Sequence, residues 1–311
     1  METESYLPDI TGSLGEVLVI TPKSKWESEI GDSLRAILKQ PVRALPQTEE
    51  MFDVIRMPPT DFNKTLKHHR SIIIVRTSST YKKPAFNIEK NLWAEPQIVI
   101  KIFAPNDADL KNIITEKQNE IVEAIKMKEM ERLKQAHKVR ANEDDMRKLK
   151  KEHHVQLTLP SGYNIAKDTN NFIWIAHETG LTSRGVFVYY YPYKDTNTFT
   201  KEVLINKRNQ FLRKYVPGPS NGSYMSTDEN YPTHFEEFGM NGRYSVELKG
   251  LWNLGGGGFM GGPFVSFTTL DKKRNRVVTV EGFVYAPANK KRNLVWEIES
   301  ILYTLKIPEN K

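Results

Sequence analysis

The fold of the second half of the chain depends on one stretch, Lys249–Val265, which reads K-G-L-W-N-L-G-G-G-G-F-M-G-G-P-F-V. Its glycines formally contain the pattern G-x-G-x-x-G at Gly256–Gly261. A dinucleotide site needs a strand before this pattern and a helix after it, so that the helix N-terminus meets the pyrophosphate. Here Pro263 and the β-rich segment Phe264–Thr268 follow, and no helix opens. The stretch therefore predicts a glycine-rich connection between two strands rather than a nucleotide-binding loop.

On both sides of this connection, apolar runs typical of strands alternate with helical patterns. These runs predict strands at Asn171–Ala176, Val186–Tyr191, Tyr244–Leu251, Phe264–Leu270 and Arg276–Tyr285. Apolar residues at helical spacing predict helices at Thr200–Tyr215 and Lys290–Leu305. The second half is therefore expected to be rich in antiparallel sheet, with two packed helices.

The first half of the chain begins with strands and ends in a long charged helix. Apolar runs predict strands at Leu14–Thr21, Met51–Met57, Ser71–Arg76, Gln97–Phe103 and Val155–Leu159. A capping box of Ser24 and Glu27 predicts a helix that continues to Lys39. A second helical stretch, Ala108–Lys150, is so long that we expect a break near Ala141.

Together the two halves predict an α+β fold of two lobes, with mainly antiparallel sheet and packed helices. The N-terminal lobe is expected to cover residues 1–160 and to end in the charged helix and a strand. The C-terminal lobe, with the glycine-rich loop, is expected to cover residues 161–311. Because both halves order their elements in a similar way, we expect a loose duplication of the split βαβ plan.

Composition excludes several classes of function. The chain has 311 residues, a net charge of +7 and no cysteine. Without cysteine there are no disulfides and no thiolate metal sites. No apolar run reaches the ~20 residues that span a bilayer. The 45 basic residues are interspersed with 38 acidic ones, so we predict no nucleic-acid partner.

Two patterns associated with catalysis or metal binding occur in the wrong context. Gly218–Gly222 matches G-x-S-x-G, but it follows a predicted helix, whereas a nucleophile elbow precedes one. Asp228 and His234 are too near in sequence to complete a triad, so a helix-ending turn is predicted instead. The histidines form no H-E-x-x-H motif, and neighbours such as His153 and His154 point in different directions. We therefore predict no catalytic residue, no metal and no cofactor.

The aromatic strand Val186–Tyr193 has two interpretations. Aromatic side chains on both faces are typical of a central strand that is packed on two sides. Alternatively, one face forms a stacking platform for sugar rings together with Trp174 or Trp252.

The glycine loop also has two interpretations. In the first, Gly255–Gly262 presents two large apolar side chains, Phe259 and Met260, at a ligand or partner surface. In the second, both side chains cap the core, and the glycines only let the strand bend. For the first interpretation, the candidate ligand-binding residues are Trp252, Asn253, Phe259, Met260 and Tyr224.

Several segments along the chain resemble one family. They include Ser5–Pro8, Gly31–Arg35, Pro217–Pro219, Gly222–Met225, Gly250–Trp252, Phe259–Phe264 and Glu281–Pro287. The segments M-G-G-P-F and E-G-F-V-Y-A-P are the most specific. The chain resembles the domain-of-unknown-function 4837 family of Bacteroidota, nearly from end to end. That family has no established activity and supplies no functional residues.

The resemblance implies a location, because members of this family are mostly predicted lipoproteins. They carry an N-terminal signal that ends in a lipid-bearing Cys. We therefore expect this chain to start just after such a Cys. The domain would then be lipid-anchored in the cell envelope, on its periplasmic or surface face.

The expected function is that of a non-catalytic binding or interaction module for an envelope protein or glycan. The alternative is a hydrolase or lyase that acts on an envelope glycan or peptide. Glycoside hydrolysis needs two carboxylates about 5–10 Å apart. The candidates for such a pair are Glu236, Glu237, Glu247 and Glu281. A third interpretation is a structural subunit of a larger envelope assembly.

Overall fold

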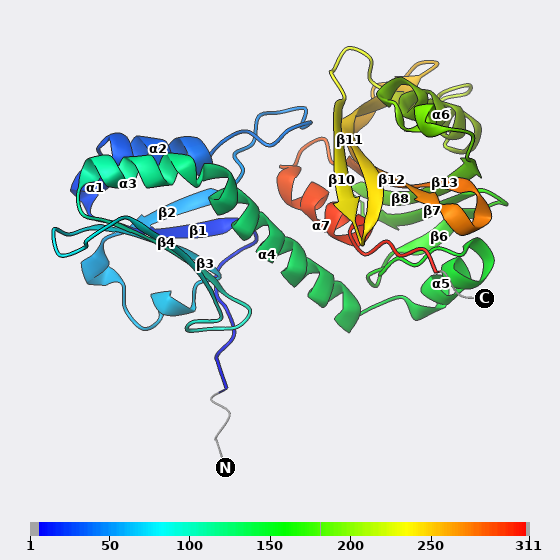
Figure 1. Cartoon of the computed structure of the whole chain (residues 1–311). Coiled ribbons are helices and arrows are strands. Elements are labelled where there is room, and N and C mark those ends of the chain that lie inside the picture. Colours follow the sequence, from blue (N-terminus) through cyan, green and yellow to red (C-terminus); the bar gives the residue numbers. More distant parts are fainter. Residues whose placement is uncertain (1–5, 181, 309–311) are drawn as a thin grey trace. The chain divides into compact units, whose positions relative to one another are not determined.

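The protein folds into two compact units. The computed structural model describes residues 6–180 and 182–308 (Figure 1). The first unit contains the chain up to Pro41 and Glu50–Arg132, and the second contains Val42–Glu49 and the chain from Leu133 onward. The boundary expected at residue 160 lies inside the second unit, because Leu149, Val155 and Leu159 are part of its core.

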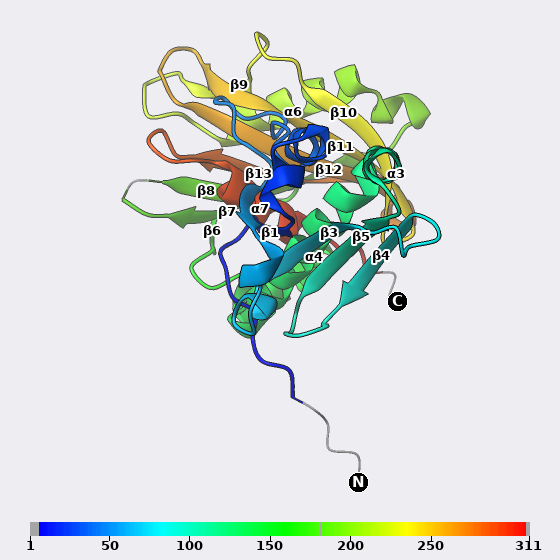
Figure 2. The same cartoon turned by 90° about the vertical axis from the view of Figure 1, so that its left-hand side faces the viewer.

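The first unit is built on a five-stranded sheet. Its strands are β1 (Glu16–Ile20), β2 (Asp53–Met57), β3 (Ser71–Thr77), β4 (Ala85–Lys90) and β5 (Ile98–Ala104). Their order is β2-β1-β3-β5-β4, and all neighbours are parallel except β4 and β5 (Figure 2). The prediction of mainly antiparallel sheet is therefore wrong for this unit. Its central strand holds the buried apolar run Ile72–Val75, which is typical of parallel strands covered on both faces.

Helices of the first unit connect and cover this sheet. They are α1 (Lys23–Trp26), α2 (Glu29–Leu38), the 3-10 turns Pro59–Asp61 and Leu66–His68, α3 (Asp107–Glu116) and the part of α4 (Gln118–Val139) up to Arg132, since the chain from Leu133 onward belongs to the second unit. The single helix predicted from Ser24 to Lys39 is broken in two. Ser28, not Ser24, is the cap of α2, because its hydroxyl oxygen accepts the amide of Ile30 at 3.3 Å.

The second unit is built on an eight-stranded sheet. Its strands are β6 (Asn164–Asp168), β7 (Phe172–Glu178), β8 (Ser183–Pro192), β9 (Tyr224–Thr227), β10 (His234–Met240), β11 (Arg243–Gly255), β12 (Gly261–Asp271) and β13 (Arg276–Tyr285). The order is β10-β11-β12-β13-β8-β7-β6, and β9 pairs with the C-terminal end of β11. All these pairs are antiparallel, as predicted for the second half.

The α+β class with a sheet in each lobe is confirmed. The expected duplication is wrong, since the two sheets differ both in strand direction and in strand order. One is mostly parallel, whereas the other is antiparallel throughout.

A helix packs on each face of the second sheet. α6 (Lys201–Tyr215) covers one face and α7 (Arg292–Leu302) covers the other (Figure 1). The shorter helices are α5 (Glu143–Lys148), a π-helical turn (Leu149–His153) and the 3-10 turns Thr196–Phe199 and Lys272–Arg274. Along β13, alternation directs Val278 and Val280 toward α7, and Glu281 and Phe283 toward α6.

Two further predictions concern the segment between the long helix and the second sheet. The break expected near Ala141 is confirmed, because α4 ends at Val139 and α5 begins at Glu143. The strand expected at Val155–Leu159 is wrong. Only an isolated bridge from Gln156 occurs there, and the alternating apolar residues are buried in the core of the second unit. None of the described helices combines the length and apolar character needed to cross a bilayer.

Candidate functional site

The glycine-rich stretch connects β11 to β12. The backbone φ is 75° at Gly256, 108° at Gly257 and 120° at Gly258, a region that residues with a Cβ rarely adopt. The path of the turn therefore explains the run of glycines. β12 follows at once and no helix begins there, so the predicted connection between two strands is confirmed.

A pocket of about 330 Å³ lies beside this connection. Six of its sixteen described lining residues have large aromatic or sulfur-containing side chains, which are Trp174, Met225, Trp252, Met260, Phe283 and Tyr285. One edge is polar and includes Glu178, Thr179 and Ser183. The turn Pro217–Pro219 also lines the pocket. Apolar walls with a few polar groups are typical of ligand sites, whose volumes begin at about 300 Å³.

The aromatic wall belongs to the face of the sheet that α6 covers. Alternation along β13 places Phe283 and Tyr285 on this face. Trp252 of β11 packs edge-on against Phe283, with ring centroids 5.9 Å apart. Its indole nitrogen donates to the carbonyl oxygen of Val284 at 3.2 Å, which fixes the ring. Trp174 of β7 also packs edge-on against Phe283, with ring centroids 6.4 Å apart. In the sheet, β7 and β11 lie on opposite sides of β13. The wall is therefore a packed set of rings with defined orientations.

The structure brings only some of the predicted ligand-binding residues to this pocket. Trp252 is 2% exposed and Met260 is half-buried, and both line the pocket. Tyr224 and Asn253 lie in the paired ends of β9 and β11, outside the described lining. Phe259 is fully exposed on the connection. Neither interpretation of the glycine loop therefore holds for both large side chains, because Met260 packs against the core and Phe259 does not.

Sequence reasoning missed several residues of the wall. Met225, Phe283 and Tyr285 were not predicted as site residues, and Trp174 was considered only as a stacking partner. The missed signal is the alternation in E-G-F-V-Y-A-P, which puts Phe283 and Tyr285 on one face of a strand.

The carboxylates considered for a hydrolase do not converge on this pocket. Glu281 and Glu247 are held in ion pairs, and Glu236 and Glu237 lie exposed on β10. Among the described wall residues, Glu178 supplies the one carboxylate. The part of the pocket that the structure describes therefore lacks the pair that glycoside hydrolysis requires.

The α6 face also contains a fully buried ion pair, Arg208 and Glu281. The Nε atom of Arg208 lies 3.0 Å from both carboxylate oxygens, and the guanidinium carbon lies 3.7 Å from the centre of the Phe264 ring. Burial raises the pKa of Glu281, and the charge of Arg208 opposes that shift. Arg208 also donates to the Thr227 hydroxyl at 2.8 Å, and Thr227 is the β9 residue opposite Trp252. The pair thus ties α6 to strands that carry the pocket wall.

The G-x-S-x-G motif forms the turn that follows α6, as predicted. The hydroxyl of Ser223 donates to the carbonyl oxygen of Ser220 at 2.6 Å and accepts the Ser220 amide at 3.1 Å. Asp228 accepts a hydrogen bond within its own turn, and His234 is exposed on β10. Among the described contacts, none joins Ser220 to Asp228 or His234, so the motif is structural.

The second unit is thus a mixed α+β domain whose antiparallel sheet carries an aromatic pocket on one face. Its sequence profile matches the family Domain of unknown function (DUF4837) over residues 142–304, about half of the chain, and the chain belongs to this family. The resemblance to this family is thereby confirmed over residues 142–304, not over nearly the whole chain as expected. A second profile, Domain of unknown function (DUF8532), matches residues 11–138, which include most of the first unit. No curated protein matches the chain.

Proposed function

We propose that the second unit is a non-catalytic binding module whose ligand enters the pocket beside the glycine connection. The observation that carries this proposal is the aromatic wall itself. Trp252 and Phe283 are almost fully buried, yet both border an open volume of about 330 Å³. Rings buried by packing alone are normally surrounded on all sides. A wall of rings beside an open volume supports a role in recognition.

The composition of the pocket favours a sugar ring of an envelope glycan as the ligand. The C–H face of a sugar stacks on aromatic rings such as Trp174 and Tyr285, which line the wall. Its hydroxyl groups need hydrogen-bond partners, and Glu178, Thr179 and Ser183 supply them at the polar edge. The volume suits one such group rather than a long chain buried along its length.

Titration with soluble N-acetylglucosamine oligosaccharides tests this proposal, because Trp174 and Trp252 would report binding through their fluorescence. We expect the wild type to bind. Tyr285→Leu removes a stacking face and should weaken binding about tenfold, or about 1.4 kcal/mol. The matched control is Tyr244→Leu, since Tyr244 is 50% exposed and lies outside this pocket. Wild-type protein that binds none of these sugars, or an equal loss in the control, would contradict the glycan class.

The proposal includes a location in the cell envelope, with a lipid anchor upstream of the described chain. Its support is the family to which the chain belongs, whose members we expect to be lipoproteins. Growth of the native host with radiolabelled palmitate should label the full-length gene product. A gene that encodes no Cys upstream of Met1 would rule out this anchor.

A further inference from the structure

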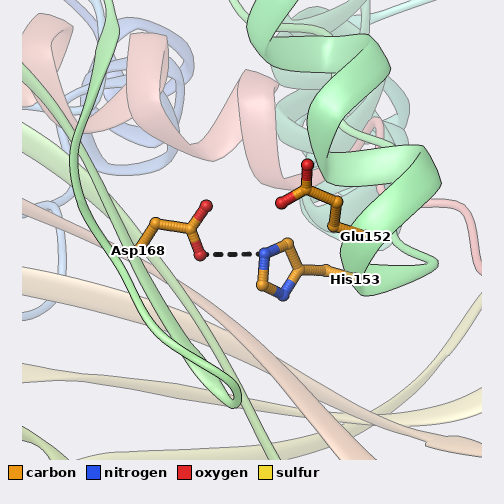
Figure 3. Close-up of side chains that lie close together, drawn as sticks. All are labelled: Glu152, His153 and Asp168. Atoms are coloured by element: carbon orange, nitrogen blue, oxygen red, sulfur yellow. Dashed lines mark ion pairs between the residues drawn. The ribbon is translucent and has the colours of Figure 1, made fainter.

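Three potential metal ligands meet in the second unit, away from the aromatic pocket. Glu152 and His153 end the π-helical turn after α5, and Asp168 is the last residue of β6. Their ligand atoms all lie within 4.8 Å of one another. Figure 3 shows Asp168 pointing from its strand toward the His153 ring, with the Glu152 carboxylate beside the same ring. The fold therefore joins a turn and a strand that the sequence separates by more than a dozen residues.

The His153 side chain is buried, and its Nε2 atom faces the two carboxylates. His153 is 4% exposed. Nε2 lies 3.0 Å from Oδ1 of Asp168 but makes no hydrogen bond. A distance of 3.0 Å is short enough for a hydrogen bond, so it is the angle at Nε2 that is unsuitable. Oδ1 therefore lies off the axis along which the ring nitrogen would donate. A buried nitrogen directed at carboxylates without a hydrogen bond calls for an explanation.

The other ring nitrogen of His153 shows where the proton resides. Its Nδ1 atom lies 3.1 Å from the hydroxyl oxygen of Tyr190. That hydroxyl donates its own hydrogen to the carbonyl oxygen of Asn170, so it can only accept from His153. Nδ1 therefore carries a hydrogen. When the ring is neutral, Nε2 presents a lone pair to the carboxylates, and a metal cation placed between them makes this arrangement favourable.

The separation of the two nearest ligand atoms fits a shared ion. Two donors that each lie about 2.1 Å from one ion, at angles between 90° and the tetrahedral value, are separated by about 3.0–3.4 Å. The observed separation of 3.0 Å falls at one end of that range. When a metal ion lies on the axis of Nε2, the second ligand of that ion lies off this axis. Oδ1 of Asp168 occupies such a position.

Neighbouring groups fix the orientation of the ligands. Lys148 binds the opposite oxygen of Asp168, Oδ2, at 2.6 Å, so Oδ1 stays directed at His153. Arg276 donates to the backbone carbonyl of His153 at 2.6 Å and stacks on the Tyr190 ring, which holds the turn in place. Glu152 is exposed, so the third ligand can adjust, and water can complete the coordination.

We propose that His153, Asp168 and Glu152 bind one divalent transition-metal ion, for which Zn²⁺ is the suitable probe. One imidazole nitrogen with two carboxylates suits Zn²⁺ or its neighbours in the first row. Mg²⁺ and Ca²⁺ favour sets of oxygen ligands. Spacing along the chain does not reveal this site, because the site joins His153 to Asp168 rather than to the adjacent His154.

The test is equilibrium dialysis of the chelator-treated full chain against Zn²⁺, with metal and protein both quantified. We expect one Zn²⁺ per chain and much weaker binding of Mg²⁺. His153→Asn and Asp168→Asn should each lower the affinity for Zn²⁺ at least about 100-fold, and Tyr190→Phe about 10- to 100-fold, since an outer hydrogen-bond partner typically has that effect. The matched control is His154→Asn, because His154 is exposed and next in the chain. It should bind Zn²⁺ like the wild type.

The outcomes separate this site from binding at surface histidines. Equal losses in His153→Asn and His154→Asn would overturn the proposal, and so would the absence of stoichiometric binding by the wild type. If the buried changes unfold the chain, Glu152→Gln serves instead, since this side chain is exposed. Circular dichroism should then show an intact fold, and an unchanged affinity for Zn²⁺ would count against the site.

Discussion

The two faces of the second sheet are built from different side chains. The face toward α7 is mainly branched aliphatic, with Phe267 as a buried exception, and includes Ile173, Ile175, Val186, Val188, Val265, Val278, Val280 and Val284. The face toward α6 is aromatic and includes Phe172, Phe187, Tyr189, Tyr191, Trp252, Phe264 and Phe283. The same strands supply both sets through their alternation. One sheet thus has an aliphatic face and an aromatic face.

The difference shows where the fold leaves room for a ligand. Branched aliphatic residues interlock with α7 closely enough that Ile298 occupies the space above Gly282. Rings are flat plates that stack in pairs, as Phe187 and Phe283 do at 5.0 Å. The pocket lies on this aromatic face, and so does the buried Arg208–Glu281 pair. Under the proposed function, recognition falls on the aromatic face, while both faces contribute to stability.

The largest expected effect comes from breaking the buried ion pair of the aromatic face. Arg208→Met should leave Glu281 buried without its partner and cost about 3–5 kcal/mol of unfolding free energy. Denaturant unfolding measures this cost. The double change Arg208→Met, Glu281→Leu should recover much of the loss, because no buried charge then remains. A cost below about 1 kcal/mol for the single change would show that the ion pair contributes less to the unfolding free energy than its buried contacts indicate.

A second prediction tests the close packing of the aliphatic face. A Cβ at Gly282 would lie 1.7 Å from the Cγ2 atom of Ile298, so Gly282→Ala should lower the unfolding free energy by about 1–3 kcal/mol. The control is Gly239→Ala on β10, where a Cβ meets nothing within 4 Å and the change should be within about 0.5 kcal/mol. Adding Ile298→Ala to Gly282→Ala should relieve the clash. Equal behaviour of the two glycine variants would argue against tight packing on this face.

The fold could be predicted from sequence where a strand is buried on both sides. β13 was predicted with its bounds, Arg276–Tyr285, because apolar residues occur on both of its faces, and Val277–Val284 are all buried. The strands β4, β6, β9 and β10 were missed. These strands are short or largely solvent-facing, as in β4, where no residue is fully buried. The parallel pairing of the first sheet was also missed, because pairing depends on how the chain crosses over, which a local pattern does not encode.

The candidate site could be predicted only where one segment carries the signal. Trp252 and Met260 were found because the glycine run drew attention to them, and both line the pocket. Phe283 reaches the same pocket from a strand that the hydrogen-bond order places two positions from β11. The cluster of His153 and Asp168 was missed for a similar reason, since it forms only when a turn packs against β6. Residue spacing along the chain could not predict those site contacts that join distant segments.

The smallest expected effect separates the two large side chains of the glycine connection. Phe259 is fully exposed, so Phe259→Ala removes no buried surface and should change the melting temperature hardly at all. Met260 is half-buried against the aromatic core, so Met260→Ala should cost about 1–2 kcal/mol. Thermal unfolding of the two single variants measures this contrast.

A binding measurement then tests the role of Phe259. If the side chain does not contribute to folding, its removal can affect only contacts with a ligand or partner. Titration of Phe259→Ala with the same oligosaccharides should give a weaker affinity at an unchanged melting temperature if the connection folds over the ligand. The glycines at 256–258 make such a path available, since all three already adopt positive φ. A clear fall in the melting temperature of Phe259→Ala would mean instead that its ring packs in solution. The aromatic face would then extend through the connection as core, and Phe259 would have no place in recognition.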